Sequence, residues 1–431
     1  MSAPFARKRF AVVGLGRAGL PAARRLREFG AGVVVWDDGE ASRDAAVAEG
    51  FEVQRPSEVG GHFDALVLSP GIPHLLPKPH KEAVWARENG VPVLTDAELL
   101  YQAVRALGSK ARFAGITGTN GKSTTTALLA HILTVAGIPN AAGANLGPAA
   151  LSLPILPDDG VYVLEMSSYM LERLASLRFD VAVMLNLSPD HLDRHGDMAG
   201  YEAAKREIFA RQDAGCTAII GIEDNPSRVM AYWLAGQPAK IVAISSEYYE
   251  TPPNRALAGQ HNAQNAFAAS EAAKALGVSE AAIEEGIKTF PGLAHRAQEV
   301  AVRDGVRFIN DSKATNADAA SRAMGVFEHF VWIAGGVAKA GGIDDLAVFF
   351  PRIEKAFLIG RDGEIFARRL SEAGVANDYV GTLEQAVPAA FEAAKAGSGI
   401  VLFSPATASF DQFPNFELRG ERFVALAKGD M

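Results

Sequence analysis

The sequence predicts an α/β protein of three domains, each built on a mostly parallel sheet. With 431 residues, the chain is too long for one hydrophobic core, and its length favours two to four domains. Short apolar runs typical of strands alternate with helical stretches through short connections, which is the pattern of parallel sheets. Two of these strands run into glycine-rich turns that open helices. We expect domain limits at residues 1–96, 97–295 and 296–431.

The composition is that of an ordinary globular protein, with 48% hydrophobic and 21% charged residues. The formal net charge of −8 argues against general nucleic-acid binding, although a local basic cleft can still bind small anions. Cys216 is the only cysteine, so an internal disulfide is excluded and a reducing cytoplasm is favoured. No apolar run reaches the length of a membrane span. We expect a soluble, cytoplasmic protein.

The first domain begins with a strand at residues 9–14 that runs into Gly14-Leu-Gly16-Arg-Ala-Gly19 and a helix. A second strand, residues 32–36, ends at Asp37, about twenty residues after the glycines. This spacing matches the dinucleotide-binding pattern and predicts a Rossmann-like domain. The loop Ser69-Pro-Gly follows a further strand and would lie at the same edge of the sheet. Alone, such glycines indicate only a pyrophosphate site or a close-packed turn.

The central domain is organised around a second glycine-rich turn. A strand at residues 112–116 leads into Gly118-Thr-Asn-Gly-Lys-Ser-Thr, and Lys122 opens a helix that runs to about residue 136. Backbone N–H groups in such a turn hold phosphates, the lysine neutralises charge, and a Ser or Thr hydroxyl reaches Mg²⁺. The turn departs from the strict phosphate-loop pattern, because Ile116 stands where that pattern has glycine. An ordinary turn with a solvated lysine is the alternative, and we favour an ATP-binding, P-loop ATPase-type domain.

Other polar residues of this domain have both a functional and an ordinary explanation. Glu165 ends the apolar strand 161–165, where a carboxylate can hold Mg²⁺. His191 follows strand 181–187 and is either a functional group or a surface histidine. Asn262 and Asn265 share a helix face, which is equally compatible with helix polarity. Lys205 falls within the apolar arc of a helix at residues 201–211, where a lysine either is buried or extends its ammonium to water.

The third domain is predicted to be a Rossmann-like α/β domain. Strand 306–310 leads into Asp311-Ser-Lys313-Ala-Thr315-Asn, and strand 399–404 leads into a loop that contains Ser409. Lys313 is either an anion contact or a solvated loop lysine. Lys339 lies between glycines, a setting that suits anion contact without proving it.

Taken together, these motifs make the chain resemble the Mur ligase family along nearly its whole length. The glycine-rich turn looks like the ATP-binding loop of Mur ligases and folylpolyglutamate synthetases. The motifs that carry the resemblance occur in this order: Gly118–Thr124, Leu164-Glu-Met-Ser-Ser-Tyr, Asn186-Leu-Ser-Pro-Asp-His-Leu-Asp-Arg-His, Tyr201-Glu-Ala-Ala-Lys, His261-Asn-Ala-Gln-Asn, Asp311-Ser-Lys-Ala-Thr-Asn and Ser404-Pro-Ala-Thr-Ala-Ser-Phe-Asp-Gln-Phe.

The resemblance implies roles for named residues. Contacts to ATP would come from Gly118, Thr119, Asn120, Gly121, Lys122, Ser123, Thr124, Asn265, Arg296 and Asp311. Two Mg²⁺ ions would be held by Ser123, Glu165, His191 and a carbamylated Lys205, and Lys122 would join the last three as catalytic residues. A UDP-muramoyl substrate would contact Gly14, Leu15, Gly16, Arg17, Gly19, Asp37, Ser69, Pro70, Gly71, Asn145 and His191. A D-glutamate pocket would be lined by Lys313, Thr315, Lys339, Ser409 and Phe416.

The implied activity is that of an ATP-dependent acid–amino-acid ligase of peptidoglycan synthesis. The enzyme would join UDP-N-acetylmuramoyl-L-alanine to D-glutamate through an acyl-phosphate intermediate. We expect the protein to be a monomer. Other amide ligases of the same family, or folylpolyglutamate synthetase-like ones, are the near alternatives. An NAD-dependent oxidoreductase would use only the first glycine motif, and a P-loop kinase or ATPase switch would leave two domains without a role.

The chain departs from the family pattern at Val337-Ala338, Phe410 and Pro414, which bears on the D-glutamate contacts. The stretch Asp224-Asn-Pro-Ser is similar to a signature of diaminopimelate-adding relatives. Because it lies in the central domain, before the Asn262 helix, we interpret it as a helix start.

Overall fold

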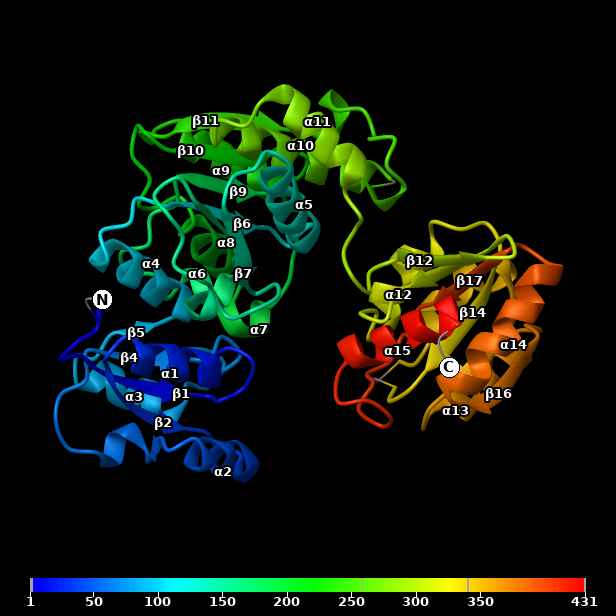
Figure 1. The fold of residues 1–431 in the computed structure, drawn as a ribbon, viewed down its shortest axis with the longest axis horizontal. Helices are drawn as coiled ribbons and strands as arrows, with labels where there is room; N and C mark the ends of the chain where they lie inside the picture. Colours follow the sequence, from blue (N-terminus) through cyan, green and yellow to red (C-terminus); the bar gives the residue numbers. More distant parts are fainter. Residues whose placement is uncertain (1–2, 258, 339–340, 430–431) are drawn as a thin grey trace. The chain divides into compact units, whose positions relative to one another are not determined.

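The computed structural model describes residues 3–257, 259–338 and 341–429. The chain divides into two compact units, Met1–Phe290 and Pro291–Met431. Two sheets lie in the first unit and one in the second, and helices flank all three (Figure 1). The predicted α/β class with three sheets is therefore confirmed. The unit boundary falls five residues before the predicted limit at residue 295, and the finer limits at residues 96 and 295 stay a prediction.

The first sheet is entirely parallel, with strand order β3-β2-β1-β4-β5. Because β2 and β4 pair with opposite edges of β1, the loops after β1 and β4 diverge and open a crevice at the carboxyl edge of the sheet. The predicted strands near residues 9, 32 and 65 are confirmed. The elements are β1 Arg9–Val13, α1 Gly19–Glu28, β2 Gly32–Trp36, α2 Glu40–Ala48, β3 Glu52–Val53, β4 Ala65–Leu68, α3 Lys81–Glu88 and β5 Val93–Leu94.

The second sheet is also entirely parallel, with strand order β11-β10-β9-β6-β8-β7. Its strands are β6 Arg112–Thr117, β7 Asn140–Ala144, β8 Val161–Glu165, β9 Val181–Met184, β10 Thr217–Gly221 and β11 Lys240–Ile244. Its helices are α4 Asp96–Ala106, α5 Lys122–Val135, α6 Ser168–Leu171, α7 Leu192–His195, α8 Met198–Arg206, α9 Asn225–Leu234, α10 Gln260–Ala275 and α11 Glu280–Thr289.

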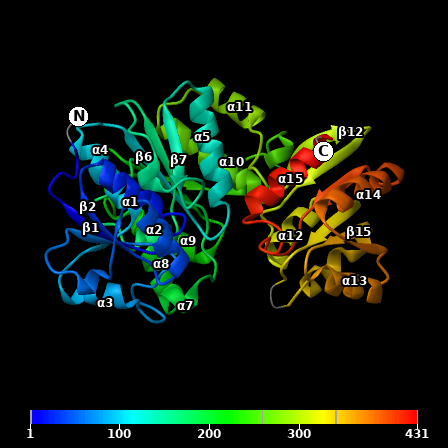
Figure 2. The same ribbon diagram turned by 60° about the horizontal axis from the view of Figure 1, so that its bottom comes forward.

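The helix that follows the phosphate-binding turn packs beside α10 and α11 (Figure 2). Leu128, Leu129 and Ile132 of α5 are buried in one apolar cluster with strand residues such as Ile116, as their helical spacing predicts. Val135 is partly exposed, because it lies in the last turn of the helix. The apolar stripe of α5 therefore fixes the turn that precedes it.

Aspartate side chains cap the first turns of α8 and α9. The start of α8 differs from the prediction, and the start of α9 agrees with it. Helix α8 begins at Met198 rather than Tyr201, because the Asp197 side chain accepts from the Gly200 N–H at 2.9 Å and caps the helix. Asp224 caps α9 in the same way, accepting from the Ser227 N–H at 2.7 Å. The Asp224-Asn-Pro-Ser stretch is thus a helix start, as predicted.

The second unit contains a mixed sheet with strand order β12-β13-β17-β14-β15-β16. Among the described strands of this sheet, β12 alone runs antiparallel, to β13, and this half-buried edge strand was not predicted from the sequence. The core flanks both faces of the sheet, with Trp332 on one and Phe308 on the other. The elements are β12 Gln298–Arg303, β13 Val306–Asn310, α12 Ala317–Met324, β14 Phe330–Gly335, β15 Ile353–Ile359, α13 Gly363–Glu372, β16 Asn377–Gly381, α14 Leu383–Ala396, β17 Ile400–Phe403 and α15 Phe416–Lys428.

Among the helices of the described residues, none combines the length and the apolar character that crossing a bilayer requires.

A buried carboxylate joins α4 to the segment that follows α6. Glu98 is fully buried, and its carboxylate accepts from the backbone N–H groups of Ala175, Ser176 and Leu177 at 2.9–3.0 Å. The Ser176 hydroxyl also donates to it. One buried side chain therefore binds three consecutive backbone N–H groups of this segment, in which Leu177 is buried while Ala175 and Ser176 are exposed.

We expect Glu98→Ala to lower the free energy of unfolding by about 3 kcal/mol, because the buried carboxylate and its hydrogen bonds to three backbone N–H groups are lost. Urea denaturation of the two proteins measures the difference. Glu88→Ala is the matched control, since Glu88 is exposed at the end of α3 and its replacement should change stability by less than about 0.5 kcal/mol. Equal midpoints for the wild type and the Glu98 variant would contradict this role.

Candidate active site

The phosphate-binding turn joins β6 to α5 and needs glycine at both ends. Gly118 and Gly121 have φ angles of 150° and 86°, which side chains rarely adopt. A Cβ at Gly121 would lie 2.2 Å from Oδ1 of Asn265, which comes from α10. The Asn265 amide also donates to Asn262 Oδ1 at 3.0 Å. The predicted asparagine pair therefore shares one helix face, and Asn265 lies against the turn.

The turn is held from two directions. Asn186, which follows β9, accepts from the Asn120 N–H through its side chain at 2.9 Å and from the Thr119 N–H through its carbonyl at 3.0 Å. The Lys122 ammonium donates to the carbonyl oxygens of Gly118 and Thr119 at 2.9 and 2.8 Å. Contacts within the protein therefore fix the conformation of the turn.

Lys205 is buried beside the same turn, with 2% of the residue exposed. Its Nζ donates to the Gly118 carbonyl at 2.9 Å and to the Thr117 hydroxyl at 3.1 Å. Burial, and then the nearby Lys122 charge, lower the pKa of Lys205 well below its usual value. The alternative in which this ammonium reaches water is wrong, because the side chain is buried, and the lowered pKa favours the neutral amine.

Glu165 offers a carboxylate oxygen that no described residue satisfies. Its Oε1 accepts from the Asn145 side chain at 2.6 Å, while its buried Oε2 has no hydrogen-bond partner among the described residues. Ser123 is buried in the first turn of α5. An unsatisfied buried carboxylate oxygen and a hydroxyl fit the oxygen ligands that Mg²⁺ prefers. Within the described ranges, no three His, Cys, Asp or Glu side chains complete a metal site, so water or substrate oxygens would have to supply the other ligands.

His191 is held in the left-handed region, with φ 53°, at the start of α7. Its side chain is 48% exposed, with Nε2 3.4 Å from Asp190 and its ring centroid 5.0 Å from that of Tyr169. It lines a cavity of about 290 Å³. We call it the smaller cavity, because a larger one is described below. Its lining residues include Lys122, Asn145, Ser168, Tyr169, Asp190, His191, Tyr201 and Lys205.

The smaller cavity therefore collects side chains that are far apart in the sequence. Lys122, Asn145, His191 and Lys205 were predicted as site residues, and all four line it. Ser168, Tyr169, Asp190 and Tyr201 were not assigned roles. They stand inside the motifs that carried the family resemblance, so the motifs contained the signal.

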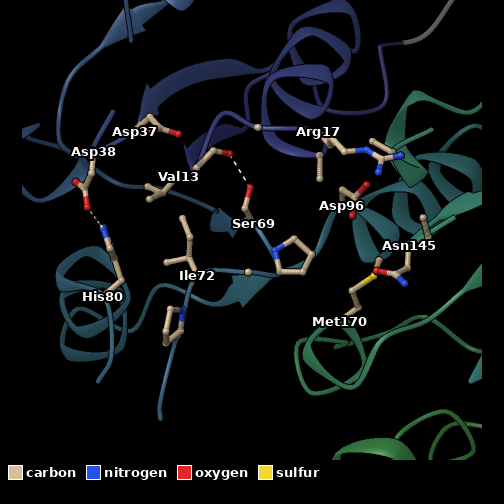
Figure 3. A pocket seen from close by; sticks show the side chains of 18 of the residues that line it. Val13, Arg17, Asp37, Asp38, Ser69, Ile72, His80, Asp96, Asn145 and Met170 are labelled. Atoms are coloured by element: carbon tan, nitrogen blue, oxygen red, sulfur yellow. Dashed lines mark hydrogen bonds and ion pairs between the residues drawn. The ribbon is translucent and has the colours of Figure 1, made fainter. Parts of the chain in front are cut away.

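A larger cavity of about 700 Å³ opens at the carboxyl edge of the first sheet (Figure 3). Most of the predicted UDP-substrate residues line it, namely Gly14, Gly16, Arg17, Asp37, Ser69, Pro70, Gly71 and Asn145. Leu15, Gly19 and His191 do not, because Leu15 is buried, Gly19 packs against the turn and His191 lines the smaller cavity. Asp38, His80 and Asp96 also line the cavity, and the sequence analysis did not select them.

The three glycines of the first motif are required for different structural reasons. A Cβ at Gly19 would lie 1.7 Å from the Gly14 carbonyl oxygen, so α1 can start here only with glycine. Gly14 has a φ of 87° and packs against Ser69, whose hydroxyl donates to the Gly14 carbonyl at 2.7 Å. No described atom lies within 4 Å of the Cβ position at Gly16. Gly16 thus leaves room for a ligand.

Asp37 holds the glycine-rich turn as well as facing the cavity. Its two carboxylate oxygens accept from the N–H groups of Leu15 at 2.6 Å and Gly39 at 2.8 Å. The neighbouring Asp38 contacts His80 at 3.2 Å (Figure 3). A hydrogen bond from the Trp36 indole, followed by His80, lowers the pKa of Asp38. The edge of the cavity near β2 is therefore anionic.

Three residues line both cavities: Pro70, Gly71 and Asn145. The two spaces are consequently neighbours, and a ligand anchored at the first glycine motif can extend toward the phosphate-binding turn.

In the second unit, Asp311 is buried directly after β13. It accepts from the Ser404 hydroxyl at 2.7 Å and from the Ala297 N–H at 3.1 Å. Burial raises the pKa of Asp311 to about 7, and these hydrogen bonds and the Arg296 charge only partly oppose the rise. Because β13 and β17 are parallel neighbours, Asp311 and the loop that contains Ser409 follow adjacent strand ends.

Among the predicted D-glutamate residues of this unit, Lys313 and Phe416 lie close to one another. The Lys313 ammonium lies 5.6 Å from the Phe416 ring centroid, Ser409 is buried, and Thr315 is half-buried. Lys339 lies outside the described residues. Of the positions that depart from the family pattern, Phe410 is largely exposed and Val337 pairs with Ala408 through the backbone.

Comparison with known proteins agrees with this geometry. A family model for the Mur ligase middle domain matches residues 116–252, and one for the NADPH-binding domain of acetohydroxy acid isomeroreductase matches residues 4–104. UDP-N-acetylmuramoylalanine–D-glutamate ligase from Caulobacter vibrioides is 49% identical, over 99% of this chain and 96% of that protein. The protein of the same name from Paramagnetospirillum magneticum is 46% identical, over 98% and 96%.

A solved structure extends the comparison to the fold. UDP-N-acetylmuramate-alanine ligase from Thermotoga maritima superposes with a TM-score of 0.57 at 20% identity, covering 98% of this chain and 100% of that one. This chain belongs to the Mur ligase family. Its full-length relatives named above are the family's D-glutamate ligases. The match to an NADPH-binding domain covers the first sheet alone and agrees with its Rossmann-like topology.

Gly19 is tightly packed and Gly16 has free space beside it, so the two glycines give a paired prediction. Gly19→Ala should lower the free energy of unfolding by about 2 kcal/mol, because the methyl group meets the Gly14 carbonyl. Gly16→Ala should leave stability within about 0.5 kcal/mol of the wild type, yet weaken UDP binding about tenfold by filling the space a pyrophosphate needs. Thermal unfolding and calorimetric UDP titration distinguish the two. Normal UDP binding by a folded Gly16 variant would contradict the assignment of this cavity.

Proposed function

We propose that this chain is an ATP-dependent ligase that joins the carboxylate of UDP-N-acetylmuramoyl-L-alanine to the amine of D-glutamate. The observation that carries the proposal is the pair of neighbouring cavities, which share Pro70, Gly71 and Asn145. One opens at a dinucleotide-type glycine turn and the other at a phosphate-binding lysine. The names and full-length identity of the relatives support the same substrates. The reaction belongs to peptidoglycan synthesis.

A free carboxylate is a poor electrophile, so ATP must activate it. The substrate carboxylate oxygen attacks the γ-phosphorus of ATP, the bond from that phosphorus to the bridging oxygen breaks, and ADP leaves. The resulting acyl phosphate is attacked at carbon by the D-glutamate amine, which loses a proton as phosphate departs. Lys122 and the N–H groups of the turn would hold and neutralise the phosphates. Alignment of the three reactants supplies the remaining rate enhancement.

Ser123 and Glu165 would hold one Mg²⁺, and His191 with a carbamylated Lys205 a second. Bound Mg²⁺ would neutralise charge on the transferring phosphoryl group. The partnerless Glu165 oxygen supports the first site. For the second, an ammonium at Lys205 would repel a cation. The lowered pKa of Lys205 makes the neutral amine available, and its reaction with CO₂ forms an N–C bond, releases a proton and leaves an anionic oxygen ligand.

The second unit would supply the amino-acid site. Lys313 carries a charge that suits the carboxylates of D-glutamate, and Thr315, Ser409 and Phe416 are assigned to the same pocket. Asn265, beside the phosphate-binding turn, would contact the nucleotide, and the same role is assigned to Asp311 and Arg296. The limits 1–96, 97–295 and 296–431 would then divide UDP, ATP and amino-acid binding. Lys339 remains a predicted contact.

We place the enzyme in the cytoplasm and expect it to act as a monomer. The lone cysteine, Cys216, is buried and unpaired, which suits a reducing compartment.

Phosphate release that requires both UDP-N-acetylmuramoyl-L-alanine and D-glutamate tests the reaction. Lys122→Ala should reduce turnover at least about 10³-fold, because charge stabilisation of the phosphoryl group is lost. UDP binding should stay near the wild-type value, since the first glycine motif lies in the other cavity. NADH binding with no substrate-dependent phosphate release would overturn the ligase proposal in favour of an oxidoreductase.

Lys205 gives a second test, based on charge sign. Lys205→Ala should lose most activity and regain part of it with added acetate, which replaces the carbamate. Lys205→Glu should retain more activity than Lys205→Arg, because an anionic ligand is needed. Nuclear magnetic resonance with ¹³C-labelled bicarbonate should show a carbamate signal that is absent from the alanine variant. If the arginine variant works as well as lysine, the carbamate proposal is wrong.

A further inference from the structure

Arg173 is a buried arginine near the active site that the proposed reaction does not use. It follows α6, and only 3% of the residue is exposed. Every guanidinium nitrogen donates to one segment, residues 68–74. Nη1 reaches the carbonyls of Leu68 at 2.9 Å and Ser69 at 3.2 Å, Nη2 reaches that of Ile72 at 2.7 Å, and Nε reaches His74 Nδ1 at 3.3 Å.

The geometry of this contact requires the planar, branched guanidinium group of arginine. Leu68 is the last residue of β4, and residues 69–72 form the loop that leaves it. A planar guanidinium can bind the carbonyls of Leu68, Ser69 and Ile72 at once, whereas a lysine offers a single nitrogen. Burial lowers the pKa of Arg173 to about 10, and the adjacent Glu172 partly offsets this, so the side chain stays protonated at neutral pH.

The segment that Arg173 holds forms walls of both cavities. Ser69 and Ile72 line the larger cavity, and Pro70 and Gly71 line both. Arg173 itself lines neither. Ser69 also bonds the Gly14 carbonyl of the first glycine turn. Any shift of this segment would move one cavity relative to the other.

The opposite end of the contact is anchored at the phosphate-binding side. Seven residues separate Glu165, at the end of β8, from Arg173, and they include the short helix α6. Arg194, three residues after His191, adds a second hold from α7, donating to the Gly71 carbonyl at 3.0 Å. Two arginines from segments that follow β8 and β9 of the second sheet therefore bind carbonyls of the loop after β4 of the first sheet.

We propose that Arg173 is a positioning residue that fixes the spacing between the two cavities. A substrate anchored by its nucleotide in the larger cavity then presents its carboxylate at the phosphate-binding turn. This inference rests on the proposed function. It assigns Arg173 no contact with substrate, and it predicts that alignment rather than nucleotide affinity depends on this side chain.

The test compares Arg173→Lys and Arg173→Met with the wild type. Because a displacement of about 1 Å can cost about 10²-fold in rate, kcat in the phosphate-release assay should fall by about that factor. The Kd for UDP alone, which needs only the larger cavity, should change by less than about threefold. The kcat of Arg173→Lys should exceed that of Arg173→Met by no more than about tenfold, because a lysine ammonium cannot bind three carbonyls as the planar guanidinium does.

Arg178→Met is the matched control. Arg178 lies five residues further on, is partly exposed, and pairs with Asp180 and Asp213 away from both cavities. It should retain wild-type kcat and UDP affinity. Arg194→Met provides a second variant whose side chain is not buried in the fold, and it should lower kcat about tenfold without weakening UDP binding.

The outcomes separate positioning from simple stabilisation. Unchanged kcat in folded Arg173 variants overturns the proposal, and so does a parallel loss of kcat and UDP affinity. If the Arg173 variants fail to fold, Arg194→Met decides, and wild-type kcat in that variant overturns the proposal. Failure of the wild type itself to release phosphate with both substrates would instead overturn the proposed function, while its UDP titration would remain interpretable.

Discussion

Two lysine side chains converge on one backbone oxygen at the centre of the first unit. Lys122 and Lys205 both donate to the Gly118 carbonyl at 2.9 Å. Two ammonium groups so close together repel, and burial penalises the charge of Lys205 further. Asp190 and Glu165 only partly oppose these effects. The positive charge at the turn therefore favours a bound anion, and the pKa of Lys205 is lowered. Both properties arise because the two lysine side chains meet at the Gly118 carbonyl.

The architecture explains why such groups meet. Parallel strands end at a common edge, so residues that follow them are neighbours even when distant in sequence. Gly14, Ser69, Gly118 and Glu165 all lie at or directly after strand ends in the first unit. Asp311 occupies the equivalent place in the second. The sheets thus supply the scaffold, and the loops at their carboxyl edges carry the polar groups that define the candidate site.

Much of this arrangement could be predicted from local sequence. Glycine turns between a strand and a helix have a strict signature, so the phosphate-binding turn and the first glycine motif were identified at their positions. The burial of Lys205 was left open, because a helical wheel shows a face and not what covers it. The tethering role of Asp37 and the bonds of Arg173 depend on carbonyls and N–H groups brought together only by folding. The edge strand β12 lacks a strong apolar pattern, which explains why it was missed.

The wall shared by the two cavities has a consequence for inhibition. A nucleotide fragment in the larger cavity and an anionic fragment in the smaller one would sit on either side of Pro70 and Gly71. Joining them with a short linker would make the second binding event intramolecular, at an effective concentration in the millimolar range. Two weak fragments could then give a tight bivalent ligand without any new protein contact. The linker length that works best would measure, in solution, the distance that the shared wall imposes.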